Sequence, residues 1–319
     1  MTTPYIRPDV KSLLAMMAAS RQPPIHELTP IEARAMRARS KVETEPPIGE
    51  LAVIRELSCP GPAGEIPLRL FDARPKRGRG DVIVFTHGGG FVFGDLDSHA
   101  SLCAEIARAM DLPVIAVDYR LAPETPFPGA PEDAIAAARW IAANGAATAR
   151  EAERLIVMGD SAGANLAIVV AVALRDSPAA VPVAAQCLIY PVTDVVADEG
   201  SGRDFAEGFF LTRAGMDWFD THYQPSATDW RRNPAMAGLA GLPPAVIMTA
   251  SLDPLLDQGR ALASELAKAG GEVVYLEARG TIHGFWSMRQ LLPSSAADVA
   301  RCLAHLKFFL GPRVDVQRN

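Results

Sequence analysis

The stretch Leu155-Ile156-Val157-Met158-Gly159-Asp160-Ser161-Ala162-Gly163 joins a short apolar run to a tight turn. The apolar run predicts a buried strand, and the apolar residues that continue over 165–171 predict a helix directly after the turn. The turn reads Gly-x-Ser-x-Gly, in which small residues let the backbone hold a serine under strain with its hydroxyl exposed. Because this pattern arises by chance in roughly one chain in ten of this size, its weight comes from its position between a strand and a helix.

Working outward from this turn, short apolar runs alternate with helical stretches. The runs predict strands at 51–57, 66–71, 82–86, 114–118, 155–158, 187–190, 245–249 and 273–276. Helices are expected near 97–110, 131–144, 162–176, 258–269 and 295–310. The alternation indicates an α/β fold with a mostly parallel, eight-stranded sheet between helices, and the first two strands form a hairpin through 59–64.

Two segments stand outside the alternation. Residues 1–48 carry an amphipathic helix at 10–19 and a second one that begins at the capping box Thr29-Pro30-Ile31-Glu32. Residues 195–235 lie in a long stretch without a strand and are rich in aromatic residues, as expected for either helix core or a binding lid. We therefore expect two cap segments, 1–48 and 195–235, over a catalytic domain made of 49–194 and 236–319.

Composition narrows the classes of function. The net charge of −6 over 319 residues argues against non-specific nucleic-acid binding. No apolar run approaches the roughly 18 residues that a membrane span needs, and the N-terminus has no basic region typical of a signal peptide. We expect a cytoplasmic protein whose four scattered cysteines are buried thiols, with neither a metal site nor a disulfide framework.

A second glycine-rich turn follows the strand predicted at 82–86. It reads His87-Gly88-Gly89-Gly90-Phe91. Three consecutive glycines are costly in conformational entropy, so their backbone N–H groups are expected to approach a ligand. We predict an oxyanion hole from Gly88, Gly89 and Gly90 together with the N–H of Ala162.

A serine hydroxyl needs a base and an orienting carboxylate. Among the six histidines we predict His283, in a loop just past the last strand; His87 is expected to brace the glycine turn, and His99 to lie at the surface or in packing. Asp253 follows the strand at 245–249 and is the predicted carboxylate, whereas Asp257 is expected to cap or brace a helix. The chain order serine, aspartate, histidine is that of an α/β-hydrolase.

These motifs together resemble the bacterial hormone-sensitive-lipase-like (family IV) carboxylesterases of the α/β-hydrolase superfamily. The match extends over about 82–310 and includes His87-Gly88-Gly89-Gly90-Phe91, Asp118-Tyr119-Arg120-Leu121-Ala122-Pro123-Glu124, Gly159-Asp160-Ser161-Ala162-Gly163, Asp253-Pro254-Leu255 and His283-Gly284-Phe285. The resemblance implies a helical cap, hydrolysis of carboxylic esters with short acyl chains, no cofactor or metal, and a homodimer through the last strand and its helix.

The sequence thus predicts a serine carboxylesterase for small-molecule esters with short to medium acyl chains. Phe91, Phe209, Phe210 and Leu255 are candidates for an apolar substrate pocket. The same residues could serve an amidase, a lactonase or a peptidase. A non-catalytic ligand receptor, like the plant gibberellin receptors that resemble this family, is disfavoured because serine, aspartate and histidine are all present.

Overall fold

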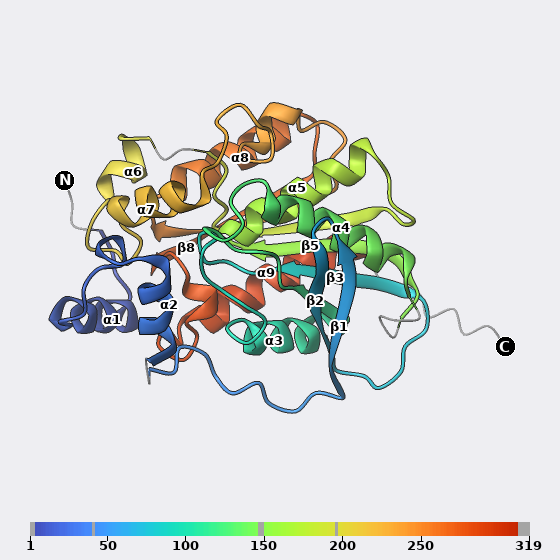
Figure 1. Cartoon of the computed structure of the whole chain (residues 1–319), viewed down its shortest axis with the longest axis horizontal. Coiled ribbons are helices and arrows are strands. Elements are labelled where there is room, and N and C mark those ends of the chain that lie inside the picture. The colour runs from blue at the N-terminus through green and yellow to red at the C-terminus, as the bar shows by residue number, and fades with distance from the viewer. Residues whose placement is uncertain (1–3, 40–41, 146–149, 195–196, 312–319) are drawn as a thin grey trace.

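The computed structural model describes residues 4–39, 42–145, 150–194 and 197–311. Its centre is an eight-stranded sheet with strand order β1-β2-β4-β3-β5-β6-β7-β8 (Figure 1). The strands are β1 (Val53–Gly61), β2 (Gly64–Asp72), β3 (Gly80–Thr86), β4 (Val114–Val117), β5 (Ala152–Asp160), β6 (Val183–Ile189), β7 (Ala245–Leu252) and β8 (Val273–Ile282). Only β2 runs against its neighbours β1 and β4, and the other paired strands are parallel. The predicted α/β-hydrolase fold is confirmed.

Helices cover both faces of this sheet. Helices α4 (Gly129–Ala143), α5 (Ala162–Asp176) and α8 (Leu256–Lys268) share one apolar core with it, and α3 (Ala100–Met110) and α9 (Ser295–Leu310) share another. β3 is buried along its whole length, because a central parallel strand with helices on both sides has no solvent face. None of the described helices is long and apolar enough to cross a membrane.

Several strands are longer than the sequence predicted. The hairpin at the front turns through Pro62 and Ala63 alone, since Gly61 pairs with Gly64 and the expected loop residue Cys59 pairs with Ile66 inside the sheet. β8 continues to Ile282, six residues beyond the predicted end at 276 (282 − 276), and its register against β7 shifts between Ala250 and Leu252. β8 continues past its apolar run through Glu277, Arg279 and Thr281, because residues that interrupt an apolar run still pair through their backbone.

The two segments outside the alternation lie on the same side of the molecule (Figure 1). The N-terminal segment carries α1 (Pro8–Ala19), a short 3₁₀ turn η1 (Ile25–Glu27) and α2 (Pro30–Arg39), and the second segment carries α6 (Gly200–Asp204) and α7 (Arg213–Tyr223). Trp218 of α7 donates through Nε1 to the carbonyl of Leu28 at 2.8 Å, so the two segments touch directly. The capping box is present: Thr29 N–H donates to Glu32 at 2.9 Å, and Glu32 N–H to the Thr29 hydroxyl at 3.3 Å.

Candidate active site

Ser161 occupies the turn between β5 and α5, and its backbone is strained. Its φ is 55° and its ψ is −119°, a conformation that side chains other than glycine rarely adopt. The turn can be this sharp because Gly163 has no side chain. A Cβ there would overlap the carbonyl oxygen of Thr86. The Thr86 hydroxyl instead donates to the carbonyl of Gly163 at 2.7 Å. The serine therefore stands at the carboxyl edge of the sheet, at the N-terminus of α5.

Three side chains that are distant in sequence meet at this edge. His283 Nε2 lies 2.8 Å from Ser161 Oγ, and His283 Nδ1 lies 2.7 Å from Asp253 Oδ2. Asp253 is fully buried, and its other oxygen accepts the N–H of Leu255 at 2.8 Å. Asp253 follows β7 and His283 follows β8, which are neighbours in the sheet, so their common edge brings the two residues together.

The glycine turn after β3 faces the same place, with one correction to the sequence prediction. The N–H of Gly88 donates to Asp160 Oδ1 at 2.8 Å and is therefore not free for a ligand. Within the described residues, the N–H groups of Gly89 and Gly90 donate no hydrogen bond, whereas the Gly89 carbonyl accepts from Val92 and Phe93 at 3.1 and 2.8 Å. Of the four predicted oxyanion donors, Gly89, Gly90 and Ala162 remain candidates.

Buried polar groups support this glycine turn from below. Tyr119 donates from its hydroxyl to the carbonyl of His87 at 2.7 Å, and His87 Nδ1 lies 2.9 Å from the carbonyl of Gly88. Burial, with the nearby His99, lowers the pKa of His87 to about 4, so the imidazole is neutral at neutral pH. His87 thus has the bracing position that the sequence predicted, and its low pKa removes a competing charge beside the site.

The support includes a pair that the sequence prediction missed. His99 is buried, and its Nε2 lies 3.3 Å from Asp160 Oδ1. Burial alone would raise the pKa of Asp160, but His99 and the N–H of Gly88 outweigh it and hold that pKa below its ordinary value. Asp160 is therefore an anion that fixes Gly88, and the only sequence signal for it was its place inside the Gly-x-Ser-x-Gly turn.

The predicted pocket residues lie in different surroundings. Phe91 is buried and stacks on Tyr223, with ring centroids 3.9 Å apart, and Leu255 is buried in the turn after Asp253. The ring of Phe209 packs edge-on against Phe205 at 5.1 Å. Phe210 is 40% exposed, and its ring lies 3.3 Å from where a Cβ on Gly284 would be, next to His283.

Phe219 of α7 was missed. A Cβ on Gly90 would overlap its ring, so this side chain lies directly against the candidate oxyanion turn. Its position inside an aromatic helix gave no signal that distinguished it from core residues. No group of three or more histidine, cysteine or acidic side chains in the described parts of the chain could hold a metal ion.

Comparisons with known proteins agree with this geometry. A family model described as alpha/beta hydrolase fold matches residues 83–287. The chain is 42% identical to carboxylic ester hydrolase LipN of Mycobacterium tuberculosis over 81% of this chain and 70% of that protein. It is 35% identical to ethyl acetate hydrolase of Pseudomonas putida over 90% of this chain and 94% of that protein.

Solved structures of ester hydrolases have the same fold as this chain. An ester-hydrolase from the metagenome of Lake Arreo, solved with a derivative of bipyridine phosphonate, superposes with a TM-score of 0.90 at 38% identity, covering 96% of this chain and 100% of that one. A thermostable esterase from Pseudomonas putida gives a TM-score of 0.91 at 29% identity, covering 98% of this chain and 100% of that one. The chain therefore belongs to the α/β-hydrolase family, among its hormone-sensitive-lipase-like members, and is a carboxylic ester hydrolase.

Proposed function

We propose that this hydrolase cleaves carboxylic esters with short to medium acyl chains in two steps, through an acyl-enzyme on Ser161. The observation that carries the proposal is the pair of hydrogen bonds made by one imidazole, from His283 to Ser161 at 2.8 Å and to Asp253 at 2.7 Å. A base within this distance of the hydroxyl can take its proton as the oxygen attacks.

In the first step Ser161 Oγ attacks the ester carbonyl carbon, and its proton passes to His283 Nε2. Asp253 accepts the hydrogen bond from Nδ1 and stabilises the imidazolium. The negative oxygen of the intermediate then receives hydrogen bonds from the N–H groups of Gly89, Gly90 and Ala162, of which Ala162 also starts α5 and adds the positive end of that helix.

In the second half His283 gives its proton to the departing alcohol. Water then enters, loses a proton to the same imidazole and attacks the acyl carbon. The bond from this carbon to Ser161 Oγ breaks, Oγ takes the proton back from His283 Nε2, and the carboxylic acid leaves. No step requires a metal ion or a cofactor.

The preference for small acyl groups rests on the segments around the site. The second of the proposed caps, residues 1–48 and 195–235, carries Phe210 and Phe219, whose rings lie against the Cβ positions of Gly284 and Gly90. Phe91 and Leu255 are buried, and Phe209 packs on Phe205. A relative named ethyl acetate hydrolase supports a small ester as substrate. A cytoplasmic location and a homodimer stay predictions from the sequence.

A serine-reactive organophosphonate tests the assignment. We expect one phosphonyl group per chain, found on the peptide that contains Ser161, and complete loss of esterase activity. The Ser161→Ala variant should take up no label under the same conditions. Labelling at a different serine, with Ser161 unmodified in the inactivated protein, would refute the proposal. Parallel assays with matched esters, amides and lactones separate the esterase from its alternatives.

A further inference from the structure

Ser201 joins the aromatic-rich residues 197–235, here called the aromatic segment, to the turn that carries Asp253. It lies in α6 and its side chain is buried. Its hydroxyl donates to the carbonyl of Pro254 at 3.0 Å and accepts the N–H of Asp257 at 3.1 Å. One hydroxyl therefore bridges both halves of the turn at 253–257, across 53 and 56 residues of sequence.

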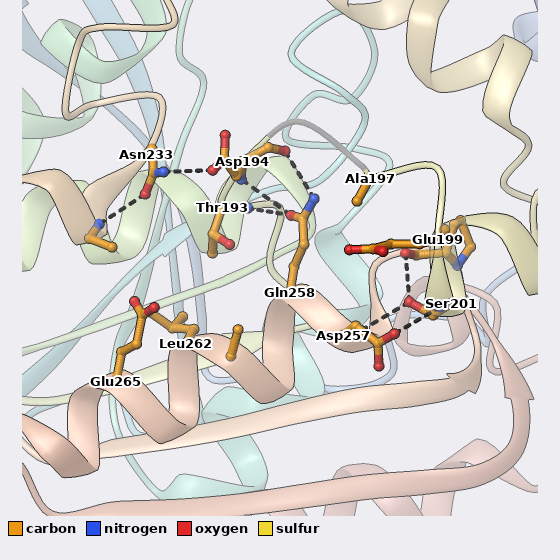
Figure 2. A pocket seen from close by; sticks show the side chains of 14 residues that line it. Thr193, Asp194, Ala197, Glu199, Ser201, Asn233, Asp257, Gln258, Leu262 and Glu265 are labelled. Carbon is orange, nitrogen blue, oxygen red and sulfur yellow. Dashed lines mark hydrogen bonds between the residues drawn. The ribbon is translucent and has the colours of Figure 1, made fainter.

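Asp257 returns the contact. Its carboxylate oxygen Oδ2 accepts the backbone N–H of Ser201 at 2.8 Å (Figure 2). A Cβ on Gly200 would overlap this same oxygen, so the segment before Ser201 approaches α8 as closely as a glycine permits. The serine thus satisfies an N–H at the start of α8, and the aspartate satisfies one at the start of α6, a reciprocal capping between two helices.

The turn at 253–257 is bonded on its inner side and faces a cavity on its outer side. Inside it, the N–H groups of Leu255 and Leu256 donate to the side chain and the carbonyl of Asp253, at 2.8 and 3.0 Å. On the outer side, Ser201 and Asp257 line a cavity of about 280 Å³ (Figure 2). Pro254 also lines this cavity, so the Ser201 hydroxyl holds the part of the turn that has open space on its outer side.

We infer that Ser201 is a positioning residue of the hydrolase, which holds the turn at Asp253 so that its carboxylate faces His283. The inference rests on the proposed function, because it acts through the proposed roles of Asp253 and His283. It also makes the aromatic segment part of the catalytic geometry as well as a cover over the substrate.

The surroundings of His283 and Asp257 show which other groups lie near this contact. Besides Asp253, the imidazole faces the ring of Tyr190, at 4.6 Å between centroids, and the Tyr190 hydroxyl lies 3.3 Å from Asp160. On the outer side, Asp257 pairs with Arg260 at 3.1 Å, and Arg260 pairs with Glu277 at 2.7 Å.

Ser201→Ala removes the hydroxyl and leaves the triad residues in place. We expect kcat to fall about tenfold, with KM within about twofold of the parent. The alignment of the Asp253 carboxylate with His283 is lost, whereas the contacts with substrate are kept. Ser201→Thr keeps the hydroxyl, has the cavity to receive its methyl group, and should restore kcat.

Gln258→Ala is the matched control. Gln258 is also on α8 and lines the same cavity, but its side chain hydrogen-bonds the backbone of Thr193 and Asp194 and, within the described residues, makes no hydrogen bond to 253–257 (Figure 2). It should leave kcat and KM unchanged. All rates are measured below the melting temperature of each variant, so that loss of folded protein does not enter kcat.

Three results would overturn the inference: a Ser201→Ala enzyme with the parent's kcat, a lowered kcat with KM raised by the same factor, or an equal loss of kcat in Gln258→Ala. A Ser201→Ala defect that Ser201→Thr does not rescue would count against the hydroxyl in the same way. Each of these leaves the proposed function intact, provided that Ser161→Ala is inactive. An active Ser161→Ala variant would instead refute the proposed function itself.

Discussion

The turns at the carboxyl edge of the sheet and the aromatic segment at 197–235 are held in place by different forces. At the edge, backbone sterics decide: Ser161 has a positive φ, and a Cβ on Gly163 would overlap the Thr86 carbonyl. In the aromatic segment, side-chain packing decides. Trp218 stacks on Phe93 at 5.7 Å between centroids, and Phe219 meets the same ring edge-on at 5.6 Å.

The difference explains why chemistry and substrate choice can change separately in such a fold. A turn in which a Cβ on either glycine would overlap a neighbouring backbone atom admits few sequences and keeps one geometry. A cluster of rings admits many sequences, provided that volume is conserved, and a repacking that moves Phe219 changes the space beside Gly90. We expect substitutions at the edge to remove activity and substitutions in the aromatic segment to redirect it.

The largest expected effect is at the serine itself. Ser161→Ala removes the proposed nucleophile without adding volume and should lower kcat by about 10⁶, as loss of this group does in other serine hydrolases. Initial rates with a butyryl ester at neutral pH measure it. Retention of even a hundredth of the activity, with contaminating esterase excluded, would contradict the assignment.

Gly90→Ala tests the steric argument next. Gly90 has a φ of 62°, and its new Cβ would overlap the ring of Phe219. Displacing its N–H from the oxyanion should cost about 10²–10³ in kcat. The double variant with Phe219→Ala removes the overlap and should regain about tenfold, measured as the coupling in a double-mutant cycle.

Gly208→Ala is the matched control for backbone strain. Gly208 has a φ of 82° and lies in the aromatic segment, with no atom within 4 Å of its would-be Cβ. It should lose stability but keep kcat. Equal losses of kcat in Gly90→Ala and Gly208→Ala would show that strain anywhere near the site suffices and that close packing at Gly90 has no special role.

Acid should weaken the support beneath the glycine turn. Because the pKa of His87 is about 4 in the folded protein and ordinarily 6.5, the unfolded chain binds a proton in this window that the folded chain does not. The free energy of unfolding therefore keeps its full value above about pH 6.5. It falls as the pH drops toward 4, by at most about 3 kcal/mol.

Urea unfolding at pH 7 and 4.5 measures this loss. We expect the parent to lose about 2 kcal/mol more than His87→Gln over this interval. His305→Gln changes a half-buried histidine on α9 instead and should behave as the parent. An identical pH dependence in the parent and His87→Gln would contradict the buried, neutral imidazole.

The smallest effect is expected at the rim of the aromatic segment. Phe210→Ala removes a ring that is 40% exposed and lies beside Gly284. The ratio of kcat/KM for dodecanoyl over butyryl esters should rise about tenfold, since a longer chain gains the space. Phe308→Ala, on α9 and 79% exposed, should leave this ratio unchanged. A parent enzyme that already prefers the dodecanoyl ester would contradict the proposed small acyl site.

Much of the candidate site was predictable because its parts are local. The turn around Ser161 and the glycines after His87 are steric requirements written in consecutive residues, and the strand before each is a plain apolar run. Asp253 and His283 were predictable from parallel strands, whose carboxyl ends must share one edge. The bond from Gly88 to Asp160, which removes one predicted oxyanion donor, had no local signal.

The chain's sequence by itself determined the alternation of strands and helices, the two sharp turns and the identities of serine, aspartate and histidine. Tertiary structure alone decided which N–H groups stay free, that Phe219 lies on Gly90, and that Ser201 reaches the turn of Asp253. The reason is physical. Backbone conformation depends on neighbouring residues, whereas these contacts join positions from 53 to 129 residues apart (254 − 201 and 219 − 90), whose meeting depends on how the whole core packs.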